Sequence, residues 1–189
     1  GHRAADRAVL ASFAAQLQHR GPDHTGVWSE GQIGLAHCRL AIIDLHPESN
    51  QPMSYADGRY VIAFNGEIYN YLELRETLAS HGYTFRTHSD TEVLLAAYAH
   101  YGTECLPHLR GMFAFAIWDR TARTLFLARD RIGKKPLKYA WIGDTFIFAS
   151  ELKALLTYPG FTPGVAWEDV GEYLLHGYIP SSGTGFRGI

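Results

Sequence analysis

The sequence predicts an α+β fold in which antiparallel strands lie between layers of helix. Helical segments stand near the start, in the middle and near the end of the 189-residue chain. Four short β-prone segments follow one another over residues 112–149, with turn-like residues between them. Such close succession favours antiparallel pairing. Helices on both sides of these strands would bury both faces of the sheet.

Length and composition indicate a globular protein of about one domain. Hydrophobic residues make up 47% of the chain, and 17 Lys and Arg balance 19 Asp and Glu. This balance excludes a basic nucleic-acid surface as the main function. No apolar run approaches the roughly 20 residues of a membrane helix, and the first residues lack the apolar core of a signal peptide. We therefore expect no nucleic acid or membrane as partner, and a cytoplasmic location.

The N-terminal third predicts one helix and two strands. Apolar residues at i, i+4 and i+8 predict a helix over 4–18, and Gly21 and Pro22 mark the loop after it. The segments 33–43 and 59–64 are short and β-prone, and their apolar character is nearly continuous. This pattern is typical of strands that are buried on both faces.

Capping residues predict the helix starts in the rest of the chain. Asn70 with Glu73, and Ser89 with Glu92, have the spacing of capping boxes. Ser150 would cap a short helix. The remaining predicted elements are strands over 112–118, 124–128, 137–142 and 145–149, and a last helix over 168–176.

Asn65 and Gly66 follow a predicted strand and have two interpretations. Asn-Gly is typical of a tight hairpin turn. Alternatively, the Asn side chain and the Gly N–H both face a reacting atom, as the donors of an oxyanion hole do, because Gly lets the backbone approach closely. Little room for a return strand remains before Asn70. Spacing alone leaves both interpretations open.

Arg39 and Asp90 are candidate charges for binding a ligand. An Arg in an apolar strand is either a rim side chain that reaches water or a clamp on a carboxylate. Asp90 is explained by the capping box alone, or it pairs with a ligand's ammonium group. Cys38 and Cys105 are too few for a disulfide framework, and we interpret them as small buried hydrophobes. The ten His residues show no zinc spacing, and no phosphate-binding glycine motif occurs. We therefore expect no metal.

Eight segments, in this order, closely resemble the glutaminase domain of asparagine synthetase. They are residues 19–23, 37–44, 51–53, 64–70, 89–92, 111–116, 128–133 and 149–153. The resemblance implies a class II glutamine amidotransferase domain with the N-terminal nucleophile (Ntn) hydrolase fold, a four-layer αββα sandwich with two antiparallel sheets. Residues 1–165 would form this domain. Residues 166–189 would lead into a C-terminal ATP-dependent synthetase domain.

The resemblance also implies a mechanism. In this family an N-terminal Cys attacks the side-chain amide of glutamine, and its own α-amino group, which titrates near 7.7–8.0, serves as the base. The attack produces a tetrahedral oxyanion, then a γ-glutamyl thioester and ammonia, and water releases glutamate. This sequence begins with Gly1. We therefore expect the first strand, with its Cys, to precede Gly1 in the natural protein.

The resemblance assigns roles to the matching pocket positions. The Asn65 side chain and the Gly66 N–H would form the oxyanion hole. Arg39 would bind the α-carboxylate of glutamine, and Asp90, helped by Glu67, would bind its α-ammonium group. The other positions that would line the pocket are Leu40, Ile42 and Ile43.

The implied function is glutamine hydrolysis that passes ammonia to the synthetase domain, which amidates aspartate to asparagine. L-glutamine and the protein's own synthetase domain are the implied partners, and a homodimer stays open. The glutaminase domain needs no cofactor, whereas ATP and Mg²⁺ belong to the synthetase domain. The alternative is a non-catalytic scaffold, as in β-lactam-synthetase-like relatives that keep this domain without its Cys. Class II amidotransferases of sugar-phosphate or purine pathways are disfavoured, because they do not resemble residues 39–44 and 67–71.

Overall fold

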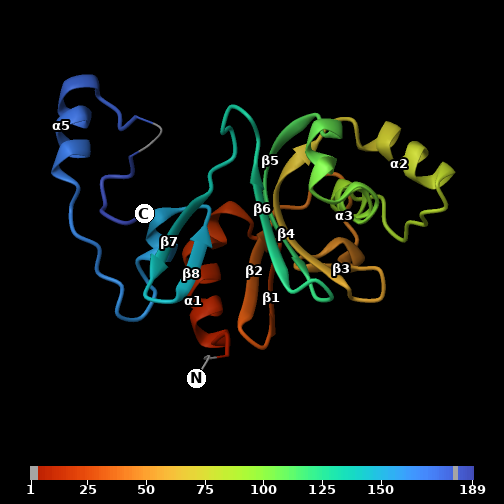
Figure 1. Ribbon diagram of the computed structural model, residues 1–189, viewed down its shortest axis with the longest axis horizontal. Helices are drawn as coiled ribbons and strands as arrows, with labels where there is room; N and C mark the ends of the chain where they lie inside the picture. The colour runs from red at the N-terminus through yellow and green to blue at the C-terminus, as the bar shows by residue number, and fades with distance from the viewer. Residues whose placement is uncertain (1–3, 181–182) are drawn as a thin grey trace. The chain divides into compact units, whose positions relative to one another are not determined.

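The structure is a computed structural model that describes residues 4–180 and 183–189 (Figure 1). Its helices are α1 (Arg7–Leu17), α2 (Tyr71–Ser80), α3 (Asp90–Tyr101), α4 (Leu152–Leu155) and α5 (Trp167–His176), with 3₁₀ segments η1 (Gln18–Arg20), η2 (Pro47–Ser49) and η3 (Gly102–His108). Its strands are β1 (His24–Glu30), β2 (Ile33–Arg39), β3 (Met53–Tyr55), β4 (Tyr60–Ile68), β5 (Gly111–Asp119), β6 (Thr124–Arg129), β7 (Lys138–Ile142) and β8 (Thr145–Ala149). Among the described helices, none has the length and apolar character needed to cross a membrane.

The chain divides into two compact units, and the second begins at Leu137. In the first unit, β1 pairs with β2, and β3, β4, β5 and β6 form a four-stranded sheet in that order. In the second unit, β7 pairs with β8. All pairs are antiparallel, which confirms the α+β class. The described strands nevertheless fall into three sheets and not the predicted two. The predicted division into residues 1–165 and 166–189 stays a prediction. Residues 1–3 and 181–182 of these two ranges lie outside the described residues.

The layers of the first unit run helix, sheet, sheet, helix (Figure 1). α1 covers one face of β1 and β2, where the Cys38 thiol donates to the Ala14 carbonyl at 3.1 Å. The other face of β2 is turned toward β4, because the His37 Nε2 lies 2.9 Å from the Phe64 carbonyl oxygen. α2 and α3 cover the far face of the four-stranded sheet. The candidate site lies between the two sheets.

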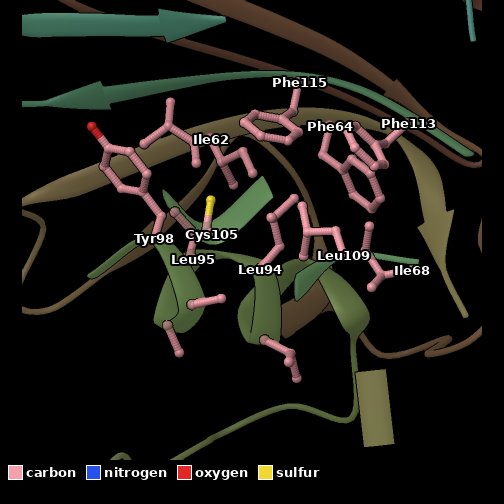
Figure 2. Close-up of a cluster of buried hydrophobic side chains, with 14 of the residues drawn as sticks. Ile62, Phe64, Ile68, Leu94, Leu95, Tyr98, Cys105, Leu109, Phe113 and Phe115 are labelled. Carbon is pink, nitrogen blue, oxygen red and sulfur yellow. The ribbon is translucent and has the colours of Figure 1, made fainter. Parts of the chain in front are cut away.

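The main hydrophobic core lies between β4, β5 and α3 (Figure 2). Ile62, Phe64 and Ile68 of β4 point into this core, and each is at most 4% exposed. Burying one such side chain contributes roughly 1.5–3 kcal/mol to stability. Because side chains alternate along a strand, Asn65 and Glu67 point to the opposite face of β4, away from this core.

The strand predicted over residues 33–43 ends early. β2 stops at Arg39, and Ile42 is 68% exposed in the loop that follows. The Ala41 N–H donates to the Asp23 carboxylate at 2.8 Å. A side chain therefore accepts this backbone N–H, where a neighbouring strand would otherwise do so. The prediction that residues 41–43 lie in a strand buried on both faces is wrong.

One predicted helix cap is confirmed and another is wrong. The Ser89 hydroxyl accepts the Thr91 N–H at 3.1 Å and caps α3. Glu92 does not complete the predicted capping box, because its carboxylate accepts the N–H groups of Arg86 and Thr87 instead. Asn70 precedes α2 but makes no cap bond. Its side-chain amide donates to the His108 carbonyl and accepts the Arg110 N–H, both at 2.9 Å. Asn70 therefore ties the end of β4 to the start of β5.

Three further elements differ from the sequence prediction. Glu151, and not Ser150, precedes α4, and it makes no side-chain cap bond. The sequence does not predict β1, whose small and polar residues break the apolar pattern of a strand. It does not predict β3 either, because three residues are too few to show a period.

Candidate active site

Asn65 and Gly66 lie inside a strand and not in a turn. They belong to β4 and pair with Ala114 and Phe113 of β5. The hairpin interpretation of this Asn-Gly pair is therefore wrong. A Cβ at residue 66 would lie 2.3 Å from the Met112 carbonyl oxygen and 2.8 Å from the Phe113 Cα. The close approach of the β5 backbone thus requires glycine at this position.

The second half of β4 has one open edge. β3 pairs with β4 only as far as Ile62, so no described strand continues on that side. In an antiparallel pair, alternate residues direct both N–H and C=O away from the partner strand. The Tyr69 N–H donates to the carbonyl of Arg110, just before β5, so the residues of β4 that bond to β5 are those in alternation with Tyr69. The residues that face away from β5 are therefore Phe64, Gly66 and Ile68. Their polar backbone groups therefore face the open edge.

Side chains from other elements fill this edge at two of the three residues. At Phe64, the Gln51 Oε1 accepts the N–H at 2.6 Å, and His37 donates to the carbonyl. At Ile68, the Asp90 carboxylate accepts the N–H at 2.9 Å. The Gly66 N–H lies between these attachments and has no acceptor among the described residues.

The Asn65 side chain presents a second free donor beside the Gly66 N–H. Its Nδ2 is shielded from solvent and has no hydrogen-bond partner in the described part of the chain. Leaving a buried donor unsatisfied costs about 1–3 kcal/mol. Two adjacent unpaired N–H donors are suited to bind an oxygen that carries negative charge.

Arg39 is buried at the end of β2 and not extended to water. It is 8% exposed, so the interpretation as a rim side chain is wrong. Its Nη1 donates to the Asn50 side chain at 2.8 Å and to the His46 carbonyl at 3.0 Å, and its Nη2 donates to the Asp44 carbonyl. A guanidinium has five N–H donors. These three bonds leave two donors for a carboxylate.

Asp44 connects the loop over residues 40–50, the Arg39 loop, to the start of α3. Its carboxylate accepts the N–H groups of His46 and His88, both at 2.9 Å, and the Ser49 hydroxyl at 2.8 Å. Burial alone would raise the pKa of Asp44, but these hydrogen bonds hold it well below its usual range. The ionised Asp44 therefore fixes the Arg39 loop to the residues just before Asp90.

Asp90 and Glu67 form the negative side of the site. Asp90 is 6% exposed at the first position of α3. Burial and the charge of Glu67 raise the pKa of Asp90, hydrogen bonds from the N–H groups of Ile68 and Thr91 lower it, and the net result is a pKa of about 6. Two neighbouring carboxylates, one of them buried, favour a cationic partner.

The remaining candidate residues are three apolar side chains and two thiols. Leu40 and Ile42 are 55% and 68% exposed on the Arg39 loop, with Ile43 partly buried beside them. Their part in lining a pocket stays a prediction. Burial raises the pKa of Cys38, and it raises that of Cys105 to about 12, so neither thiol is an activated nucleophile. In the described ranges, no three His, Cys, Asp or Glu side chains are grouped so that they could hold a metal ion.

Sequence reasoning missed two residues of this site, His37 and Gln51. Both contact the backbone of Phe64, immediately before Asn65. The available signal was their position in segments 37–44 and 51–53, which carry the family resemblance. Neither residue type suggests by itself a contact with the edge of a strand.

Comparison with known proteins identifies the family. A family model described as "Glutamine amidotransferase domain" matches residues 1–189. Glutamine-hydrolyzing asparagine synthetase 1 of Bacillus subtilis is 48% identical over 176 residues, which cover 93% of this chain and 28% of that protein. A putative glutamine-hydrolyzing asparagine synthetase of Mycobacterium tuberculosis is 43% identical over 203 residues, which cover 100% of this chain and 31% of that protein. The chain thus spans less than a third of the length of these relatives.

A solved structure shares the fold. The glutamine phosphoribosylpyrophosphate amidotransferase of B. subtilis superposes with a TM-score of 0.70 at 24% identity, over 81% of this chain and 41% of that chain. This match supports the Ntn fold of the α+β domain. The family model and the two asparagine synthetases show that the chain belongs to the class II glutamine amidotransferase domain family and matches the glutaminase region of asparagine synthetases.

Proposed function

We propose that this domain hydrolyses glutamine to glutamate and ammonia. The observation that carries the proposal is the unpartnered Asn65 Nδ2 beside the Gly66 N–H, on the β4 edge between the Gln51 contact at Phe64 and the Asp90 contact at Ile68. The B. subtilis and M. tuberculosis relatives are described as glutamine-hydrolyzing, which supports the same activity.

The charged residues select a zwitterionic amino acid. The two remaining N–H donors of Arg39 bind the α-carboxylate of glutamine, where a bidentate charge-assisted pair is favourable. Asp90 and Glu67 bind the α-ammonium group. Because Asp44 holds the Arg39 loop against the start of α3, the positive and negative sides of the site keep a fixed separation.

The oxyanion donors act when the amide carbon is attacked. In the proposed mechanism the sulfur of an N-terminal Cys bonds to the side-chain amide carbon of glutamine, and the carbonyl oxygen becomes negative. The Asn65 Nδ2 and the Gly66 N–H donate to that oxygen. The C–N bond then breaks, ammonia leaves with the proton taken from the thiol, and water hydrolyses the thioester. A single donor of this kind contributes about 2.7–4 kcal/mol to the transition state.

The ammonia would pass to a synthetase domain that amidates aspartate to asparagine with ATP and Mg²⁺. We place the glutaminase domain at residues 1–165 and the connection to the synthetase domain at residues 166–189. The sequence of this chain has no phosphate-binding glycine motif.

The proposal is tested by intact mass of the full-length protein before and after treatment with a diazo-ketone analogue of glutamine. One covalent adduct that maps to an N-terminal Cys is the expected result. No adduct, from a protein whose first residue is not Cys, would overturn the proposal and favour the non-catalytic scaffold.

We expect the KM for glutamine to rise as the pH falls through about 6, the pKa of Asp90. The ionised carboxylate binds the ammonium group, and protonation removes that charge.

The same carboxylate affects stability. Because folding raises this pKa above the ordinary value near 3.9, ionised Asp90 lowers the free energy of unfolding, and the loss develops as the pH rises from about 4 to 6. We therefore expect Asp90→Asn to raise the Tm at pH 7, to raise the KM several-fold, and to make the KM independent of pH between 5 and 8. A wild-type KM that does not change in this pH range would remove Asp90 from the ammonium site.

A further inference from the structure

The Phe64 peptide groups are held from outside the sheet. Phe64 faces the open edge of β4, where a neighbouring strand would ordinarily satisfy its N–H and C=O. The Gln51 side chain accepts the N–H at 2.6 Å, and the His37 Nε2 lies 2.9 Å from the carbonyl oxygen. Two side chains thus take the place of a strand at the residue before Asn65.

The His37 contact has a fixed direction. A carbonyl oxygen only accepts hydrogen bonds, so the Nε2 of His37 must carry the proton. Burial and the nearby charge of Arg39 lower the pKa of His37, the bond to Phe64 opposes the shift, and the net result is a pKa of about 4. The ring is therefore neutral near pH 7. A neutral imidazole whose Nε2 proton is donated to the strand cannot accept a proton at that atom during turnover.

Gln51 also contacts two elements other than β4. Gln51 is 7% exposed, and its Nε2 donates to the Thr91 hydroxyl of α3 at 3.4 Å. The Gln51 backbone lies against β1, where a Cβ at Gly26 would come within 2.0 Å of its carbonyl oxygen. Gln51 therefore connects β1, β4 and α3 at the level of the candidate site.

We propose that Gln51 and His37 are positioning residues that hold the Phe64 peptide groups, and through them the Asn65 and Gly66 donors, in the geometry required for glutamine hydrolysis. The inference rests on the proposed function. An oxyanion donor acts at about 2.7–3.1 Å from the developing charge, and it must be held within about 0.5 Å of that position to be fully effective. The held peptide groups are covalently adjacent to Asn65. Loss of either contact therefore reduces the stabilisation of the transition state more than it reduces the affinity for glutamine.

The test uses paired variants of the full-length protein. His37→Leu and Gln51→Leu remove the contacts, whereas His37→Gln keeps a donor near the Nε2 position and Gln51→Glu keeps an acceptor for the Phe64 N–H. We expect each Leu variant to lower kcat about 10-fold with the KM within twofold of wild type. We expect each conservative variant to recover kcat to within about threefold. The pH profile of kcat should be the same in His37→Gln as in wild type.

The control is Asn70→Ala, which removes two backbone contacts just beyond β4 and should lower the Tm without changing kcat. Unchanged kcat in both Leu variants overturns the proposal. So does a His37→Gln variant that is as slow as His37→Leu and has lost one limb of the pH profile, because His37 would then transfer a proton. If one Leu variant fails to fold, the other Leu variant and its conservative counterpart test the positioning role.

A second readout separates this inference from the proposed function. Hydrogen–deuterium exchange of the peptide spanning residues 62–68, measured by mass spectrometry, should be faster in both Leu variants than in wild type and in Asn70→Ala. Unchanged exchange overturns the positioning role, whether or not the protein hydrolyses glutamine. A wild-type protein that begins with Cys but has no glutaminase activity overturns the proposed function, and the exchange measurement then still decides whether these side chains hold the strand.

Discussion

Asn65→Ala is expected to lower kcat for glutamine hydrolysis about 10²–10³-fold and to leave the KM within a few-fold, because an oxyanion donor acts mainly in the transition state. The Asn65 Nδ2 is buried and has no partner among the described residues. Removing an unsatisfied donor does not weaken the fold. The Tm should therefore stay the same or rise. Steady-state kinetics and calorimetry of the full-length protein measure both effects.

Asn65→Asp is the matched comparison for this prediction. It has nearly the same shape but places a carboxylate opposite the developing negative charge, so it should be at least as slow as the Ala variant. Turnover within a few-fold of wild type in either variant would contradict the oxyanion-hole assignment. A large fall in the Tm of Asn65→Ala would instead show that the side chain has a structural partner.

Arg39→Ala is expected to raise the KM for glutamine roughly 10- to 100-fold with a smaller effect on kcat. A charge-assisted hydrogen bond contributes about 1.5–3 kcal/mol, and the α-carboxylate is bound equally in the ground state and the transition state. The substitution also removes the bonds to the carbonyls of Asp44 and His46 and to the Asn50 side chain. We therefore expect a lower Tm as well, measured beside the kinetics.

A matched Arg variant separates binding from stability. Arg59 lies at the other end of β4, where it pairs with Asp119 at 3.0 Å and stacks on the Tyr60 ring. Arg59→Ala should lower the Tm but leave the KM unchanged. If Arg39→Ala raises the KM no more than Arg59→Ala does, Arg39 does not bind the substrate. In a full-length synthetase, ammonia supplied directly should bypass the defects of both Asn65→Ala and Arg39→Ala.

Local sequence signals predicted those parts of the fold that depend on neighbouring residues. The strands after residue 111 and the α3 cap at Ser89 are encoded by short-range patterns, and the structure confirms them. Residues 41–43 show the limit of such patterns. Their apolar run predicts a buried strand, but no described strand lies beside them, and the Asp23 side chain binds the Ala41 N–H instead.

The residues proposed to contact glutamine were predictable from the sequence, but the side chains that hold β4 in place were not. The roles of Asn65, Gly66 and Asp90 came from a family resemblance, and the structure brings these three residues to one end of β4. The contacts of Gln51 and His37 depend on where β3 stops, which is a feature of tertiary pairing. Asn70 likewise has the sequence of a helix cap but makes long-range contacts to the start of β5.

The open edge of β4 also affects how this protein behaves beside copies of itself. An unpaired strand edge is a template to which a foreign strand adds, and such additions lead to aggregation. Here the Gln51, His37 and Asp90 side chains occupy the hydrogen-bonding groups on either side of Gly66. The N–H and C=O of one residue, Gly66, can bind a small polar group, but they cannot set the register of an incoming β-strand. The residues that shape the site therefore also protect the sheet from cross-chain pairing.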